Sequence, residues 1–208
     1  MPADAAGRRG KDQFAGAGAK MTPAGKPDGV KYAAFFRNLN LGRPNCPSKA
    51  QLEAAFISAG ASAAASFLTN GTVVFTVKSE ARAMKVLALA RQILQAECGL
   101  REPAYIRSID YLAGLVALDL FAAIERGDVY ECCISFLHAD SVMPAALPLE
   151  SKRRDLEIFH CTGSEALSVS RKIGSSPGSP NAFLEKLLGL PATTRSWNTV
   201  RRLVLKHG

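Results

Sequence analysis

The sequence has no apolar run long enough to cross a bilayer, no Cys-x-x-Cys pair and no basic block of the nucleic-acid-binding type. A membrane-spanning helix needs about 20 predominantly apolar residues. Near the start of the chain, Arg8 and Arg9 are followed by a glycine and a lysine, which is unlike the apolar core of a secretory signal. We therefore expect a cytoplasmic protein with no membrane partner.

Cysteine is scarce and odd in number, with five residues at positions 46, 98, 132, 133 and 161. This count and the lack of partnered spacing argue against a disulfide framework and against a zinc site. Cys132 and Cys133 are adjacent, so on a strand their side chains point to opposite faces and do not easily bind one ion. We predict buried, reduced thiols, which fit a reducing cytoplasm.

Familiar catalytic motifs are also missing. The chain has no Gly-x-Ser-x-Gly elbow, no Walker loop and no His-Glu-x-x-His pair. Its three histidines are scattered at positions 138, 160 and 207, and its aspartates form no spaced set for acid–base chemistry. The sequence therefore predicts no metal and no cofactor, assigns no catalytic residue, and leaves open whether the protein is an enzyme.

What the chain does have is a globular composition with a basic excess. Its 208 residues are 48% apolar and 21% charged, and the formal net charge is +8. This length allows one domain of ordinary size or two small ones. A basic excess favours an anionic partner such as nucleic acid or a nucleotide. The alternative is that dispersed positive charge only keeps the protein soluble.

The first part of the chain divides into an extension and an ordered half. Residues 1–28 are rich in Gly, Ala, Pro and Lys without apolar periodicity, which predicts a flexible extension. Residues 29–118 then predict strands at 32–36, 65–68, 72–77 and 104–107, and helices that begin after Ser48 and Ser79 and end at Gly60 and Gly99. The pair Asn70-Gly71 marks a hairpin. This order of elements predicts a ferredoxin-like half.

Residues 119–208 predict a second mixture of strands and helices, preceded by a helix at 110–120. The expected strands lie at 129–137, 156–160 and 166–170, the helices at 182–188 and 197–206, and a Gly/Ser/Pro-rich loop at 174–180. The prediction is thus an α+β fold in which a second, related α+β half packs against the ferredoxin-like N-terminal half. No sequence-level repeat supports a duplication, and the oligomeric state is not predicted.

The closing segment is the most distinctive part of the chain. It reads Leu190-Pro191-Ala192-Thr193-Thr194-Arg195-Ser196-Trp197-Asn198-Thr199. Two weaker landmarks precede it, a strand that ends in Arg37-Asn38-Leu39-Asn40 and a hairpin glycine just before Val73-Val74-Phe75. Together the three resemble the bacterial domain-of-unknown-function 1697 family over about residues 31–206. The resemblance implies a ferredoxin-like first half and a related, intertwined second half, and it implies no established activity, cofactor or substrate.

The chain departs from the family pattern at several positions. Asn38 stands where the family usually has Gly, and Ser196 replaces an Asn of the closing segment. The family often has a Ser-Lys pair before the penultimate helix, and its place here falls within Pro177-Gly178. If a shared activity uses that lysine, this chain has lost it or uses Arg171 or Lys172 instead.

Candidate ligand-binding residues gather first at a predicted strand end. Arg37, Asn38 and Asn40 follow the strand, where loops commonly build sites, and Asn70 lies in the hairpin. In a ligand site, Arg37 binds an anion or an amide-like group with the support of the asparagines. The alternative is that these residues cap the sheet and satisfy backbone groups of the loop. Both interpretations stay open.

The other candidates are Thr194, Arg195, Trp197 and Asn198 of the closing segment. An indole and a guanidinium can hold a base or another planar ligand while an asparagine reads its edge. The alternative is a structural helix entry, in which a threonine caps the helix, Trp197 anchors it in the core and Arg195 pairs with a carboxylate.

The leading hypothesis is a cytoplasmic α+β protein that binds an anionic ligand such as nucleic acid or a nucleotide. The alternative is an enzyme acting on a small phosphorylated or amide-containing metabolite, with Arg37 and Arg195 as anion clamps. The basic residues Arg201 and Arg202 either complement the helix dipole or contact phosphate. One enclosed pocket lined by both motifs favours the enzyme, and an open basic face favours nucleic acid. A buried Trp197 with an internally bonded Arg195 favours a structural role.

Overall fold

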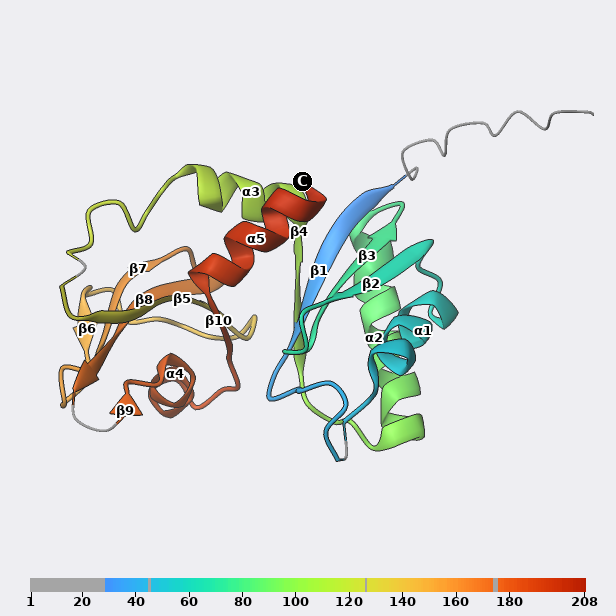
Figure 1. The fold of residues 1–208 in the computed structure, drawn as a ribbon, viewed down its shortest axis with the longest axis horizontal. Coiled ribbons are helices and arrows are strands. Elements are labelled where there is room, and N and C mark those ends of the chain that lie inside the picture. The colour runs from blue at the N-terminus through green and yellow to red at the C-terminus, as the bar shows by residue number, and fades with distance from the viewer. Residues whose placement is uncertain (1–28, 45, 126, 174–175) are drawn as a thin grey trace, which may run out of the picture.

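The computed structural model describes residues 29–44, 46–125, 127–173 and 176–208 (Figure 1). The predicted extension at 1–28 and part of the predicted loop at 174–180 lie outside the described residues. The elements in chain order are β1 (Val30–Phe36), α1 (Lys49–Ser58), β2 (Ala63–Phe67), β3 (Thr72–Val77), α2 (Glu80–Cys98), β4 (Ala104–Ser108), α3 (Ile109–Ala117), β5 (Val129–Phe136), β6 (Leu149–Glu150), β7 (Leu156–Cys161), β8 (Glu165–Ile173), β9 (Ser176–Pro177), α4 (Pro180–Leu188), β10 (Thr193–Ser196) and α5 (Trp197–His207).

The first half forms an antiparallel sheet in the order β2-β3-β1-β4. Its helices begin and end where the sequence predicts. Ser48 forms a capping box with Gln51 at the start of α1, and Gly99 ends α2 in the left-handed conformation. The β2–β3 turn needs its glycine, because Gly71 has a φ of +69° and a Cβ there would lie 2.6 Å from the Cβ of Leu39. The predicted ferredoxin-like order of elements is therefore present.

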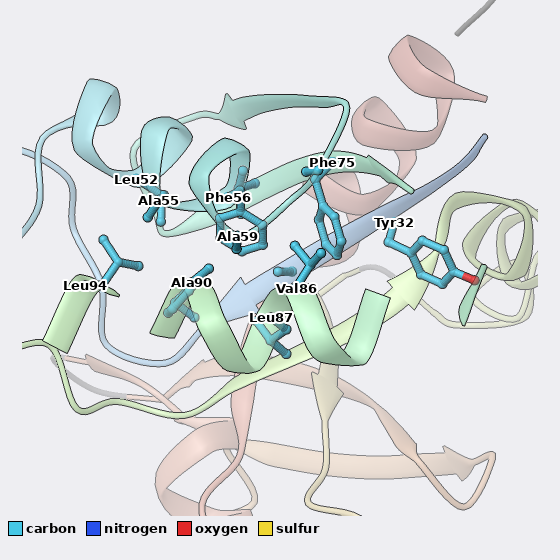
Figure 2. Packing of buried hydrophobic residues seen from close by; sticks show 14 of the residues in the cluster. Tyr32, Leu52, Ala55, Phe56, Ala59, Phe75, Val86, Leu87, Ala90 and Leu94 are labelled. Atoms are coloured by element: carbon cyan, nitrogen blue, oxygen red, sulfur yellow. The ribbon is translucent and has the colours of Figure 1, made fainter. Parts of the chain in front are cut away.

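Helices α1 and α2 cover one face of this sheet, which we call the outer face of the first half (Figures 1 and 2). Alternation along β1 sends Tyr32, Ala34 and Phe36 to this face. The apolar cluster between the two helices and the sheet contains 18 buried residues of the described chain, including Phe56 and Leu94. At about 25 cal/mol per Å² of apolar area removed from water, a cluster of this size is a main source of folding free energy.

The second half repeats the same strand arrangement. Its sheet has the order β10-β5-β8-β7-β6, again antiparallel. Without the two-residue β6, the strands β10, β5, β8 and β7 correspond to β4, β1, β3 and β2 of the first half. Helix α4 corresponds to α2, and α5 follows β10 as α3 follows β4. The place of α1 is taken by residues 137–155, which contain only β6. The α+β fold with a related second half is confirmed; the domain boundary near residue 118 stays a prediction.

The two halves meet through the inner face of each sheet together with α3 and α5. Phe35 of β1 stacks on Phe136 of β5, with ring centroids 4.0 Å apart and planes inclined by 12°. Buried residues of α3 and α5, such as Leu112 and Val200, belong to the same apolar cluster as these two phenylalanines. Figure 1 shows α5 running from the second half to the start of β1, where Lys31 donates to the carbonyl of His207 at 2.7 Å. The inner faces of both sheets are thus occupied by protein.

Several element boundaries differ from the predictions. Helix α3 ends at Ala117 rather than near 120, and α4 begins at Pro180 rather than 182. The two-residue strands β6 and β9 were not predicted, and neither was β10, since four polar residues give little strand signal. Among the described residues, no helix combines the length and the apolar character needed to cross a bilayer.

Candidate functional site

Arg195, the central residue of the closing segment, lies on β10 with only 8% of its surface exposed. Each of its five N–H bonds donates to an acceptor within the protein. The acceptors are the hydroxyls of Thr72 (3.2 Å) and Thr193 (3.0 Å) and the carbonyls of Phe36 (2.7 Å), Asn70 (2.8 Å) and Thr194 (2.9 Å). Arg195 therefore ties β10 to the end of β1 and to the β2–β3 turn, and no N–H bond remains for a ligand.

The charge of Arg195 has no carboxylate partner among the described residues. Burial lowers the pKa of this guanidinium to about 10, so it remains charged at neutral pH. The guanidinium carbon lies 5.8 Å from the ring centroid of Phe35, within cation–π range. Arg195 also contacts the hairpin asparagine directly, through the backbone carbonyl of Asn70.

Arg37, at the end of β1, is held by two carboxylates. Its Nε and Nη2 donate to Glu185 at 2.5 and 2.9 Å, and its Nη1 donates to Glu102 at 2.7 Å. The hydrogen bonds to Glu185, and then those to Glu102, raise the pKa of Arg37. Arg37 also lowers the pKa of Glu185 through the same bonds. With its charge compensated in this way, Arg37 joins β1 to α4 and to the segment before β4.

The remaining candidates at the end of β1 are exposed. Asn38 has a φ of +50°, a region that glycine and asparagine tolerate better than most residues. This backbone conformation explains why Asn can replace the Gly that the family usually has. Asn40 is exposed, and Asn70 accepts a hydrogen bond from the Thr72 hydroxyl at 2.9 Å. The loop residues therefore shape the turn and organise the hairpin.

Trp197 and Asn198 separate at the start of α5. Trp197 is 6% exposed, and its ring centroid lies 5.0 Å from that of Phe121. Ser196 caps the helix by accepting from the backbone N–H of Thr199. Asn198 points away from the core and is exposed. The buried Trp197 and the internally bonded Arg195 match the structural interpretation. Two details differ: Ser196 caps the helix in place of a threonine, and Arg195 pairs with hydroxyls and carbonyls instead of a carboxylate.

Asn198 lines a pocket of about 390 Å³ between the start of β5 and the start of α5. The pocket is lined by Val129, Tyr130, Glu131, Cys132, Ser196, Trp197, Asn198 and Arg201. Tyr130 is 58% exposed. Neither Asn198 nor Arg201 has a hydrogen-bond or ion-pair partner among the described residues. The pocket thus combines an accessible aromatic ring with an uncompensated guanidinium.

The model of the family described as "Protein of unknown function (DUF1697)" matches residues 30–166, which is more than half of the chain. The chain belongs to the DUF1697 family. The match ends before the closing segment at 190–199. A solved structure of the conserved bacterial protein SP0830 from Streptococcus pneumoniae is similar with a TM-score of 0.58 and 16% identity, over 85% of this chain and 97% of that one. This likeness shows the fold alone. No curated protein matches the sequence.

This DUF1697 protein contains a second arginine in a position like that of Arg195. Arg107 of β4 pairs with Glu165, whose side chain is fully buried at the start of β8. Tyr111 of α3 donates to the same carboxylate at 2.5 Å, and Thr162 also donates to it. Burial alone raises the pKa of Glu165, but the charge of Arg107 and these hydrogen bonds outweigh it, so the pKa lies below its ordinary value.

Sequence reasoning missed Tyr130 and Glu131 as site residues. Both lie on the predicted strand at 129–137, and strand alternation does not distinguish a pocket wall from an ordinary solvent face. Arg201 was noted only as part of a basic helix end. The one available signal was its spacing of three residues from Asn198 on a predicted helix, which places both side chains on one face.

Proposed function

We propose that this DUF1697 protein binds a small anionic ligand with a planar group, of the nucleotide class, in the pocket between β5 and α5. One observation carries the proposal: Arg201 and Asn198, neither with a partner among the described residues, line the same pocket of about 390 Å³ as the exposed ring of Tyr130. An aromatic face, a guanidinium and an amide are the groups that hold a base and a phosphate.

Each lining residue has a role in this proposal. Arg201 neutralises a phosphate, and the ring of Tyr130 stacks on the base. Asn198 supplies a donor and an acceptor for the edge of the base. Glu131 repels phosphate, so it suits the sugar end of the ligand, where its carboxylate accepts from a hydroxyl. The first two residues of α5 also present backbone N–H groups at the positive end of the helix.

A mononucleotide fits the fold better than a nucleic-acid strand does. Ferredoxin-like domains that bind RNA use exposed aromatic residues on the open face of the sheet. Here the inner faces pack on each other through Phe35 and Phe136, and α1 and α2 cover the outer face of the first half. The pocket volume lies within the usual range for small-molecule sites, about 300–1,000 Å³.

The enzyme hypothesis is less well supported. It used Arg37 and Arg195 as anion clamps, yet Arg37 donates to two carboxylates and all five N–H bonds of Arg195 are taken.

The proposal also places the protein in a reducing compartment such as the cytoplasm. Burial raises the pKa of the Cys133 thiol, as expected for a thiol that serves in packing and not in redox chemistry.

Calorimetric titration with AMP, UMP and ATP at low salt tests the proposal. The site variant is Arg201→Ala, and the matched control is Arg202→Ala, which removes the same charge from the next residue of α5 outside this pocket. A charge-assisted hydrogen bond contributes about 1.5–3 kcal/mol, so Arg201→Ala should weaken binding about tenfold or more, and Arg202→Ala by less than about twofold.

Tyr130→Ala provides a second arm of the same experiment. Stacking of a base on an aromatic ring contributes about 1–3 kcal/mol of binding free energy. Removing the ring should therefore weaken binding about fivefold or more. If the wild type binds none of the three nucleotides, or if both arginine variants lose affinity equally, the pocket is not a nucleotide site. A short oligonucleotide that binds while all mononucleotides fail would also overturn the proposal.

A further inference from the structure

The second half lacks a counterpart of α1, and this leaves the outer face of its sheet thinly covered. Helix α4 packs on that face. Among the residues that the structure describes, its cluster contains five buried apolar residues, including Ile158 and Leu184, against 18 on the outer face of the first half. Beside α4, the β6–β7 turn at 151–155 encloses a pocket of about 490 Å³. We call this the α4 pocket. It is separate from the pocket between β5 and α5.

The walls of the α4 pocket are apolar on the helix side. Phe183 is partly buried, and Leu187 is 41% exposed, one helical turn further along α4. In the first half, α1 packs against α2 across the corresponding face. Residues 137–155 form no helix there, and these two side chains of α4 line the pocket.

The rim of the α4 pocket is cationic. Lys152 and Lys186 are exposed and have no hydrogen-bond or ion-pair partner among the described residues. Asp155 also lies at the pocket, but its carboxylate is 3.3 Å from Arg153 and accepts from Ser151 at 2.6 Å. The charge of Asp155 is thus compensated within the protein, and the two lysines leave the rim positive.

We propose that the α4 pocket binds a soluble amphiphilic anion, that is, a carboxylate on a short apolar chain. The lysines at the rim pair with the carboxylate, and Phe183 and Leu187 bury the chain. Removing the apolar chain from water supplies binding free energy in proportion to its buried area, so affinity requires the chain as well as the charge. A concave pocket of about 490 Å³ suits a single small molecule, which favours a free amphiphile over a membrane surface.

The test is a calorimetric titration of the full chain with decanoate below its micellar concentration, beside 1-decanol and acetate. Decanoate should bind at least tenfold more tightly than acetate, which lacks the chain, and at least threefold more tightly than decanol, which lacks the charge. Lys186→Gln should remove the advantage of decanoate over decanol. Lys85→Gln is the matched control, because Lys85 is exposed on α2, and it should leave that advantage intact.

Phe183→Ala should weaken decanoate and decanol together, and circular dichroism checks that the variant folds. Arg201→Ala should leave decanoate binding unchanged, so this proposal and the nucleotide proposal fail independently. Equal binding of decanoate to wild type and to Lys186→Gln would overturn the assignment. So would sedimentation with phosphatidylglycerol vesicles without any binding of decanoate, because the surface would then be a membrane contact.

Discussion

The two halves share a strand order, yet the arginine on the last strand of each half is hydrogen-bonded by different acceptors. Each half places an arginine on its last strand, one residue before a serine that caps the following helix: Arg107 before Ser108, and Arg195 before Ser196. The strand register is the same in both halves. Arg107 pairs with Ala33 of β1 and Arg195 pairs with Ile134 of β5, and each partner lies two residues before a phenylalanine of the stacked pair.

The arginines reach across the molecule in a matching way. The guanidinium carbon of Arg107 lies 5.5 Å from the ring centroid of Phe136 in the second half. That of Arg195 lies 5.8 Å from the ring centroid of Phe35 in the first half. These two phenylalanines stack on each other. Each arginine also donates to a carbonyl at the hairpin tip of the opposite half, Arg107 at Ser164 and Arg195 at Asn70.

The difference lies in one acceptor. Glu165 faces Phe136 across β8 and β5, and Thr72 faces Phe35 at the same place in β3 and β1. Arg107 therefore has a carboxylate, whereas Arg195 has a hydroxyl. A buried cation needs its hydrogen bonds filled, but those acceptors need not be charged. The arginine of the closing segment therefore holds the two halves together, and its presence alone does not indicate a ligand.

The largest effect is expected for Arg195→Met, which keeps an apolar stem and removes every donor. The carbonyls of Phe36 and Asn70 lose a hydrogen-bond donor inside the protein, and the Phe36 carbonyl keeps only the hydroxyl of Thr193 at 3.4 Å. A buried polar group left without a partner costs about 1–3 kcal/mol. Relief from burying the charge offsets part of this cost. Urea unfolding should show a loss of about 3–4 kcal/mol, against less than about 0.5 kcal/mol for the exposed control Arg202→Met. A loss below about 1 kcal/mol would contradict a bracing role.

The next effect compares the two outer faces. Leu94 and Leu184 are both fully buried. Leu94 is a residue of α2 in the cluster of 18, and Leu184 is a residue of α4 in the cluster of five. Truncation of a buried leucine to alanine costs about 2–5 kcal/mol, depending on how far the site collapses. We expect about 3 kcal/mol for Leu94→Ala and about 2 kcal/mol for Leu184→Ala in urea unfolding. The reverse order would show that the second half is the better-packed one.

The third prediction concerns pH. Glu165 has a pKa below its ordinary value in the folded protein, so its stabilising effect is present above the unfolded pKa of about 4.3 and disappears as pH falls through the folded pKa. Glu165→Gln should cost about 2 kcal/mol at pH 7. The gap between wild type and variant should narrow below about pH 4. Glu150→Gln, at the exposed end of β6, is the control, and a constant gap from pH 7 to pH 3 would contradict the prediction.

The elements of the first half could be predicted because their signals are local. Ser48 and Ser79 cap the helices that begin at the next residue, and Asn70-Gly71 lies in the turn between β2 and β3. The role of Arg195 could not be predicted in this way. Its acceptors Phe36, Asn70 and Thr72 lie 159, 125 and 123 residues earlier in the chain. Only the packing of the two halves brings them together, and the sequence around Arg195 carries no mark of it.

The smallest effect is expected when the contact of Arg195 with Thr72 is made to resemble that of Arg107 with Glu165. Thr72→Asp is close in volume and places a carboxylate beside the buried guanidinium of Arg195, whose Nε lies 3.2 Å from the Thr72 hydroxyl. The new ion pair should compensate the charge and stabilise the protein by about 1 kcal/mol at pH 7. It should also add a loss of stability below about pH 4, as at Glu165. Thr72→Asn, of the same shape without charge, should do neither. If the two variants behave alike, Arg195 gains nothing from a carboxylate, and its hydrogen bonds to neutral groups already satisfy it.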